Sequence, residues 1–295
     1  MRLIKVSLTA LCVTTLLAAC STSQQKHSSS SRYAQSQDSA PDRAVDVSDV
    51  KDAIPRVEAR SRYGNPASYV VFGKRYHTLA SSEGYNERGI ASWYGTKFHG
   101  HRTSSGEPYD MYQMSAAHKT LPLPSYARIT NLQNGKSVIV KINDRGPFHD
   151  NRVIDLSYAA ASRLDILGKG TGLVEVQTID PRSHTPEAAK RTVLASKPKV
   201  AGTQPVNKTE HKDTAHKPSL YLQIGAFLSR GNAERLKTRL SSTELPGSLQ
   251  ISEGLSNQKP IYRVRIGPLV SVETADKLTQ LLIDQGIEAP RVVID

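Results

Sequence analysis

Apolar and polar positions alternate in two similar units near the carboxyl end of the chain. Residues 222–227 and 263–268 are each predicted to form a β-strand, because hydrophobic side chains recur at every second position. A segment with helical spacing follows each strand, and each unit ends in a further β-like run, at 249–252 and 291–294. The apolar helical positions are Ala233, Leu236 and Leu240 in the first unit and Ala275, Leu278, Leu281 and Leu282 in the second. The order βαββαβ predicts a ferredoxin-like α+β sandwich with both helices on one face of a four-stranded sheet.

The same alternation assigns the strand side chains to the two faces of this sheet. The predicted helix-facing residues are Leu222, Ile224, Val264 and Ile266. The opposite face then carries a patch that consists of Tyr221, Gln223, Arg263 and Arg265. An aromatic ring can stack on the apolar face of a sugar, and amide and guanidinium groups can bind hydroxyls and acetamides. The patch is therefore a candidate carbohydrate-binding surface, and the alternative is that the two arginines only form a solvated face.

Between residues 89 and 179 the chain consists of short β-like runs separated by Gly, Pro and Asn. The runs are 90–94, 127–131, 137–143 and 174–178. Asn134-Gly135 between two of these runs indicates a tight hairpin. One helix-like segment follows Ser157, and N-capping or the helix dipole would explain Asp155 just ahead of it. Many strands and one short helix predict a compact, mainly β barrel.

The first twenty residues have the layout of an export signal. Two basic residues precede an apolar run at 6–17, which is too short to span a membrane comfortably, and small residues follow. The end of this segment, Leu17-Ala18-Ala19-Cys20, resembles the bacterial lipobox. That resemblance implies cleavage before Cys20, acylation of Cys20 and, with Ser21 next to it, sorting to the outer membrane. The expected location is the outer membrane with the domains facing the periplasm; the alternative is an ordinary signal peptide with a chance cysteine.

Composition divides the rest of the chain. After a signal peptide at 1–19, residues 20–60 are rich in Ser, Gln and Asp and are expected to form a disordered tether. Residues 182–218 contain four prolines and eight basic against three acidic residues, a net charge of +5, which predicts an extended linker. The two predicted domains are therefore a barrel at 61–181 and a sandwich at 219–295.

Several classes of protein are excluded by composition and by the motifs that are missing. A mean hydropathy of −0.43 and a net charge of +12 over 295 residues argue against several membrane spans. Both cysteines lie in the first 20 residues, and His99, His101 and His118 form no zinc motif. No glycine-rich phosphate loop and no aromatic RNA-binding signature occur. We therefore expect no metal, no cofactor and no nucleic-acid partner.

Four phrases of the central region resemble one protein family. They are Gly-Ile-Ala-Ser-Trp-Tyr-Gly at 89–95, His-Arg-Thr-Ser-Ser-Gly-Glu at 101–107, Ala-Ala-His-Lys-Thr-Leu-Pro at 116–122 and Val-Lys-Ile-Asn-Asp-Arg-Gly-Pro-Phe at 140–148. They resemble the rare lipoprotein A (RlpA) family, and residues 219–295 resemble the SPOR domain. The resemblance implies a double-psi β-barrel that acts as a lytic transglycosylase on peptide-free (denuded) peptidoglycan. It also implies a SPOR domain that binds such strands at the division septum.

Asp144 is the candidate catalytic acid and base. A lytic transglycosylase uses the C6 hydroxyl of N-acetylmuramic acid as its nucleophile and closes a 1,6-anhydro ring, so one carboxyl group can serve both proton transfers. An acid would need an apolar surrounding, for which Ile142, Pro147 and Phe148 are candidates. The alternative is an aspartate that closes the turn before Gly146-Pro147.

Four more residues are candidates for the same site. Glu107 is expected to position a sugar or to polarise Asp144, unless it is a solvated loop carboxylate. His118 is a candidate hydrogen-bond partner of Asp144 or of the substrate, with an ordinary structural histidine as the alternative. Thr103 and Ser104 are expected to offer hydroxyl contacts to a sugar. The competing hypothesis for the whole chain is a non-catalytic, expansin-like protein that binds peptidoglycan in the same groove without cutting it.

Overall fold

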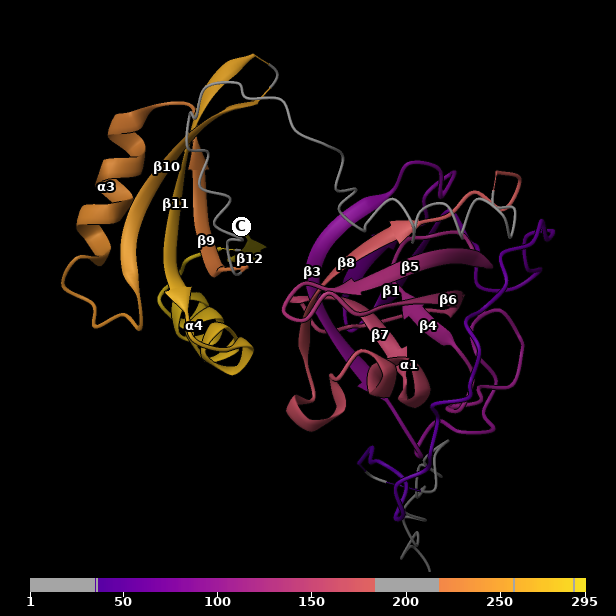
Figure 1. Cartoon of the computed structure of the whole chain (residues 1–295). Helices are drawn as coiled ribbons and strands as arrows, with labels where there is room; N and C mark the ends of the chain where they lie inside the picture. The colour runs from indigo at the N-terminus through magenta and orange to yellow at the C-terminus, as the bar shows by residue number, and fades with distance from the viewer. Residues whose placement is uncertain (1–34, 36, 184–217, 257, 289) are drawn as a thin grey trace, which may run out of the picture. The chain divides into compact units, whose positions relative to one another are not determined.

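The computed structural model describes residues 35, 37–183, 218–256, 258–288 and 290–295, which form a barrel and a separate α+β sandwich (Figure 1). The expected signal peptide at 1–19, Cys20 and most of the expected linker at 182–218 lie outside the described residues. None of the described helices combines the length and the apolar character that a membrane crossing requires.

The barrel contains six strands in the closed order β3-β7-β4-β6-β5-β8. The strands are β3 (Asn86–Tyr94), β4 (Ser115–His118), β5 (Ser125–Asn131), β6 (Ser137–Asp144), β7 (Arg152–Ser157) and β8 (Gly172–Thr178). Two pairs, β3 with β7 and β4 with β6, run parallel, and the other four pairs are antiparallel. The predicted barrel is confirmed, and so is the hairpin at Asn134-Gly135, where Gly135 has a φ of 73° between β5 and β6.

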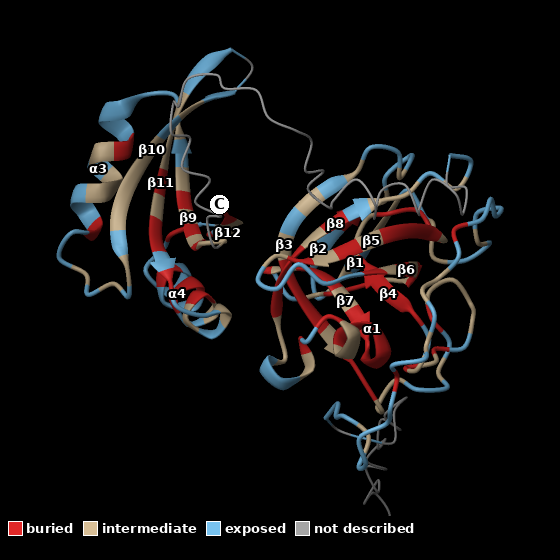
Figure 2. Cartoon of the chain, viewed as in Figure 1, coloured by how far each residue is buried: buried red, intermediate tan, exposed pale blue. Residues whose placement is uncertain are grey.

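The barrel interior is filled by aliphatic side chains. Figure 2 shows that long stretches of the barrel strands are buried. Ile129, Val140, Ile142 and Leu156 are completely buried there. The short helix α1 (Tyr158–Arg163) begins after Ser157, whose hydroxyl accepts a hydrogen bond from the backbone N–H of Ala160 at 3.2 Å. A second short turn is the 3₁₀ helix η1 (Leu167–Lys169). Asp155 therefore does not cap the helix, because it lies inside β7.

Residues 37–60 lie against the barrel, so the expected tether at 20–60 is wrong for this part of it. The carboxylate of Asp38 accepts hydrogen bonds from the backbone N–H groups of Gly95 at 2.7 Å and Lys97 at 3.1 Å. Val47 is 4% exposed and belongs to the barrel core. The polar composition of this segment does not reveal its few residues that contact the barrel. Their stabilising contacts are made with groups that are distant in sequence.

A two-stranded hairpin that the sequence did not predict precedes the barrel. It consists of β1 (Ser68–Val71) and β2 (Lys74–His77), which pair in antiparallel register. Phe72 and Gly73 form its two-residue turn with φ values of 49° and 77°.

The carboxyl-terminal domain has the predicted ferredoxin-like order. Its elements are β9 (Leu220–Phe227), α3 (Arg230–Leu240), β10 (Ser248–Ser256), β11 (Lys259–Leu269), α4 (Val272–Asp284) and β12 (Arg291–Ile294). The sheet order is β10-β11-β9-β12, so the first and third strands are central. The four predicted core residues of the strands are buried, namely Leu222, Ile224, Val264 and Ile266. Leu281 was expected on the core face of α4 but is 41% exposed, because it is next to Leu282 in sequence and is therefore rotated by about 100° around the helix from that buried residue.

Candidate active site

Asp144 lies at the end of β6 and is held by the loop that contains Ser104. The backbone N–H and the hydroxyl of Ser104 donate to Oδ1 of Asp144 at 2.7 and 2.6 Å, and the backbone N–H of Arg145 donates to the same oxygen at 2.7 Å. All three donors bind Oδ1, and no described residue forms a hydrogen bond with Oδ2. The side chain is partly exposed. One carboxylate oxygen is therefore fixed, and the other can exchange a proton with a bound molecule.

A β-bulge sets the direction of Asp144. Along the parallel pair of β4 and β6, Ala116 pairs with Ile142 and Ala117 with Asp144, so that Asn143 is an extra residue. Bulges bend a strand and are common next to active sites because they redirect a side chain. Three apolar neighbours of Asp144 were expected. Ile142 lies in β6 and is fully buried in the barrel core, whereas Pro147 and Phe148 lie in the loop that follows Asp144.

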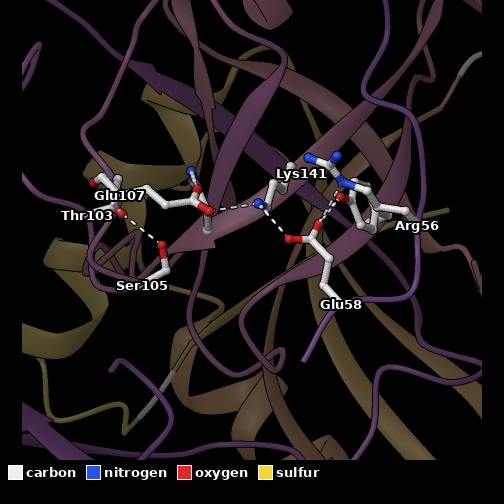
Figure 3. A network of polar contacts seen from close by, with 8 residues as sticks. Arg56, Glu58, Thr103, Ser105, Glu107 and Lys141 are labelled. Carbon is white, nitrogen blue, oxygen red and sulfur yellow. Dashed lines mark hydrogen bonds and ion pairs between the residues drawn. The ribbon is translucent and has the colours of Figure 1, made fainter. Parts of the chain in front are cut away.

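Glu107 contacts the same strand through Lys141 and Asn143, which both precede Asp144. Its Oε1 accepts from Nζ of Lys141 at 2.8 Å and its Oε2 from Nδ2 of Asn143 at 2.9 Å. Lys141 also donates to Oε2 of Glu58 at 3.2 Å, and Arg56 completes this network at 3.4 Å (Figure 3). Burial alone would raise the pKa of Glu107, but the hydrogen bonds from Lys141 and Asn143 and the charge of Lys141 lower it overall. Glu107 is thus an ionised carboxylate that suits electrostatic stabilisation and not proton donation.

His118 is buried, and both of its ring nitrogens are engaged. Nδ1 accepts from the backbone N–H groups of Thr120 at 3.2 Å and Leu121 at 3.0 Å, and Nε2 lies 2.9 Å from the hydroxyl of Tyr85. Burial, and then the charges of Arg145 and Lys119, lower its pKa to about 3. The ring is therefore neutral, with its proton on Nε2. The expected hydrogen bond from His118 to Asp144 is absent, because the ring lies inside the fold and orders the loop at 118–121.

Thr103 also has a different place from the expected one. It is 6% exposed, and its hydroxyl donates to the backbone carbonyl of Glu107 at 2.9 Å. The hydroxyl also lies 3.0 Å from Oγ of Ser105, a contact drawn in Figure 3. Thr103 therefore closes the loop at 103–107 and does not point to a sugar. Ser104 uses its hydroxyl to hold Asp144.

Arg145 is a site residue that the sequence did not single out. Its guanidinium donates to the backbone carbonyls of Gly64 at 2.8 Å, His118 at 3.1 Å and Leu121 at 2.6 Å. These bonds join two segments, the one at Gly64 and the loop at 118–121, to the residue that follows Asp144. The only signal in the sequence was the position of Arg145 next to Asp144. That position does not reveal that the guanidinium binds backbone carbonyls.

The comparisons with known proteins cover both domains. A family model described as "Lytic transglycolase" matches residues 86–177, and the SPOR domain model matches residues 217–289. The endolytic peptidoglycan transglycosylase RlpA of Pseudomonas aeruginosa is 40% identical over 291 residues, which cover 87% of this chain and 84% of the relative. The relative of the same name from Vibrio cholerae is 38% identical over 275 residues, which cover 93% of this chain and 90% of that one. This chain belongs to the RlpA family.

A solved structure of a SPOR domain is also similar to this RlpA family member. The crystal structure of the RlpA SPOR domain from Pseudomonas aeruginosa is 34% identical, covers 25% of this chain and 96% of that chain, and has a TM-score of 0.24.

The SPOR domain's helix-free face contains the four predicted residues. Gln223 pairs directly with Arg265 across the two central strands. Nη1 of Arg265 forms an ion pair with Oδ2 of Asp295 at 2.6 Å, and the Arg263 guanidinium covers Gly254 on β10. Tyr221 lies opposite Val293 of β12. Sugar binding by this face stays a prediction.

In the RlpA barrel, the region matched by the lytic transglycosylase model contains Ser104, Glu107, His118, Asp144 and Arg145. Residues ahead of the matched region also contact the site, since Glu58 binds Lys141 and Gly64 accepts from Arg145. Among the described residues, no group of three or more His, Cys, Asp or Glu side chains could hold a metal ion.

Proposed function

We propose that this chain cleaves denuded peptidoglycan strands as a lytic transglycosylase and leaves 1,6-anhydro ends. The observation that carries the proposal is the carboxyl group of Asp144, with one oxygen held by three donors and the other without a partner among the described residues. The ionised Glu107 lies on the loop that also carries Ser104, and contacts Asn143 directly before Asp144. Membership of a family of peptidoglycan transglycosylases supports the choice of substrate.

In the proposed reaction, protonated Oδ2 of Asp144 donates its proton to the glycosidic oxygen as the bond to C1 of N-acetylmuramic acid breaks. Positive charge develops at C1, and the carboxylate of Glu107 stabilises it electrostatically. The C6 hydroxyl of the same sugar then attacks C1 and gives its proton to Asp144, which restores the acid. No water is consumed, and an internal nucleophile can have an effective molarity of about 10⁵ M or more.

The SPOR domain would supply the preference for denuded strands and for the division septum. Tyr221 can stack on a sugar ring. Gln223, Arg263 and Arg265 can bind acetamides or hydroxyls that stem peptides would otherwise obstruct. Acylated Cys20 would hold the protein in the outer membrane, because several acyl chains anchor a protein stably where one chain does not.

Product analysis tests the proposed function. Residues 21–295 would be incubated with glycan strands that an amidase has stripped of their peptides, and with untreated strands as the control. We expect mass spectrometry to detect new 1,6-anhydro ends from the stripped strands and far fewer from the untreated ones. New reducing ends would indicate a hydrolase, and binding without new ends would favour the wall-loosening, expansin-like alternative.

A further inference from the structure

An exposed aromatic ring occupies the tip of the β1–β2 hairpin, where the backbone disfavours it. Phe72 is 91% exposed and has a φ of 49°, with Gly73 next to it at 77°. Two-residue turns with positive φ at both positions favour Asn and Gly, because a Cβ is strained in the left-handed region. A ring in water also adds little to the hydrophobic core. Neither turn chemistry nor packing explains a phenylalanine at this position, and strain of this kind often marks a functional site.

The hairpin is fastened to the loop that follows Asp144. The ring of Phe148 contacts three hairpin rings edge-on or tilted, with centroid distances of 6.3 Å to Tyr69, 6.5 Å to Phe72 and 5.7 Å to Tyr76. The hydroxyl of Tyr69 donates to the backbone carbonyl of Lys119 at 2.6 Å. These contacts hold the hairpin beside the loop that follows Asp144.

A second exposed ring lies beside the other loop of the site. Tyr63 is 58% exposed, and a Cβ on Gly106 would lie 3.3 Å from its ring, so Tyr63 borders the loop between Ser104 and Glu107. Its neighbour Gly64 approaches Ser104 so closely that a Cβ would lie 2.6 Å from the Ser104 carbonyl oxygen. Gly64 also accepts a hydrogen bond from Arg145. The short stretch from Tyr63 to Phe72 thus places Tyr63 beside the loop that carries Glu107 and Phe72 beside the loop that follows Asp144.

We propose that Tyr63 and Phe72 are sugar-binding platforms that hold the glycan strand on either side of the bond that Asp144 cleaves. Pyranose rings have apolar faces that stack on aromatic rings, while their hydroxyls remain in water. One platform beside each of these two loops would favour an extended strand over a short fragment. Both residues precede the region matched by the lytic transglycosylase family model, which begins at residue 86. The inference rests on the proposed function for its substrate class.

The test measures how cleavage depends on the length of the strand. Residues 21–295 and the variants Phe72→Ala, Phe72→Tyr and Tyr63→Ala would be assayed on a denuded tetrasaccharide and a denuded octasaccharide. Loss of one stacking platform should lower kcat/KM for the octasaccharide by about 5- to 20-fold, mainly through KM. The tetrasaccharide should be affected less, and Phe72→Tyr should retain the activity of the parent protein. Ile54→Ala is the control, because Ile54 is another apolar side chain that is 78% exposed. Its neighbour Ala53 donates a backbone hydrogen bond to Ile139 of β6. This variant should cleave both oligosaccharides at the parent rate.

A binding measurement separates this inference from the proposed function. Asp144→Asn and the double variants Asp144→Asn/Phe72→Ala and Asp144→Asn/Tyr63→Ala would be titrated with the octasaccharide by calorimetry, with their melting temperatures compared. Weaker binding by either double variant at an unchanged melting temperature supports that platform, even if the parent protein forms no anhydro ends. Unchanged KM and unchanged binding for both Phe72→Ala and Tyr63→Ala, in a parent protein that cleaves the strands, would overturn the inference and leave the proposed function standing.

Discussion

Asp144 and Asp155 lie opposite the same residue, Ala117, on the two sides of strand β4. Asp144 is held by donors from the Ser104 loop, and one of its oxygens has no partner among the described residues. Asp155 accepts a hydrogen bond from the hydroxyl of Ser92, which also accepts from Arg152 at 3.1 Å. Burial raises the pKa of Asp155 above its ordinary value. Two aspartates on the strands that flank β4 therefore have different environments, and each provides a control for the other.

The ion pair between Glu107 and Lys141 should matter for catalysis more than for folding. Glu107→Gln keeps the size of the side chain but removes the negative charge that the proposed mechanism places near C1. We expect kcat to fall by about 10-fold or more, because electrostatic stabilisation acts on the transition state. Because the Glu107 side chain is 45% exposed, the melting temperature should change little. Glu58→Gln alters the other partner of Lys141 and should leave kcat nearly unchanged; an equal loss in both variants would contradict this role for Glu107.

The buried His118 predicts a specific loss of barrel stability in acid. Its pKa is about 3 in the folded chain and about 6.5 in an unfolded one, so the unfolded state binds more protons between these values. The stability contributed by neutral His118 is fully present above pH 6.5 and is lost as the pH falls toward 3. Trp93 is the only tryptophan and lies in the barrel, so its fluorescence during urea unfolding reports this domain.

His118→Gln is the matching variant. It should be less stable than the parent at pH 7.5, since two backbone N–H groups lose their acceptor geometry, and its stability should vary less between pH 7 and pH 5. The same slope in both proteins would contradict a buried neutral histidine.

Much of the fold follows from local sequence patterns, whereas the depth of a side chain does not. The period-2 alternation around Leu222 and Val264 predicted the sandwich because one face of its sheet is buried and the other is open. Asn134-Gly135 predicted a hairpin because the turn needs only its own two residues. In contrast, nothing near His118 or Thr103 reveals that the barrel closes over them. Their burial depends on strands and loops that pair across long sequence distances.

The contribution of the residues ahead of the barrel was hidden for the same reason. Asp38 and Val47 lie in a polar stretch, but their partners are backbone groups at Gly95 and Lys97 and the barrel core. The β1–β2 hairpin has apolar positions that become meaningful only against Phe148. Asp144 and Glu107 were predicted as candidates from the motifs alone, while the bonds from Ser104 and Arg145 required the structure.

The helix-free face of the SPOR domain should bind denuded strands through Gln223 and Arg265. Gln223→Ala and Arg265→Ala should each weaken binding about 5-fold or more, as expected for the loss of a hydrogen bond to a neutral or charged group. Binding would be measured with residues 21–295 carrying Asp144→Asn, so that the strands stay intact. Arg235→Ala on the exposed side of α3 is the control. The double variant Gln223→Ala/Arg265→Ala should lose binding and midcell localisation while keeping the circular dichroism spectrum of the parent. If this folded double variant sediments with strands and reaches midcell as well as the parent does, the strands must bind to another surface of the protein.

Lipid anchoring depends on Cys20. Cys20→Ala should abolish labelling of the protein by radioactive fatty acid and remove it from outer-membrane fractions, because the thiol that carries the diacylglyceryl group is gone. Ser21→Ala leaves the thiol in place and should be labelled normally. Labelling of Cys20→Ala at the level of the parent would show that the lipobox interpretation is wrong.

The claim that Asp144 is the catalytic acid and base is tested most directly by counting 1,6-anhydro ends. Residues 21–295, Asp144→Asn and Asp155→Asn would be incubated with the same amidase-treated strands, and the ends quantified by mass spectrometry over time. Asp144→Asn should form them at least about 10²-fold more slowly, the usual scale for a general acid, while its melting temperature and glycan binding stay close to those of the parent. Asp155→Asn keeps an acceptor for Ser92 and should stay within about threefold of the parent rate. Anhydro ends formed at the parent rate by Asp144→Asn, or lost only in Asp155→Asn, would contradict the assignment.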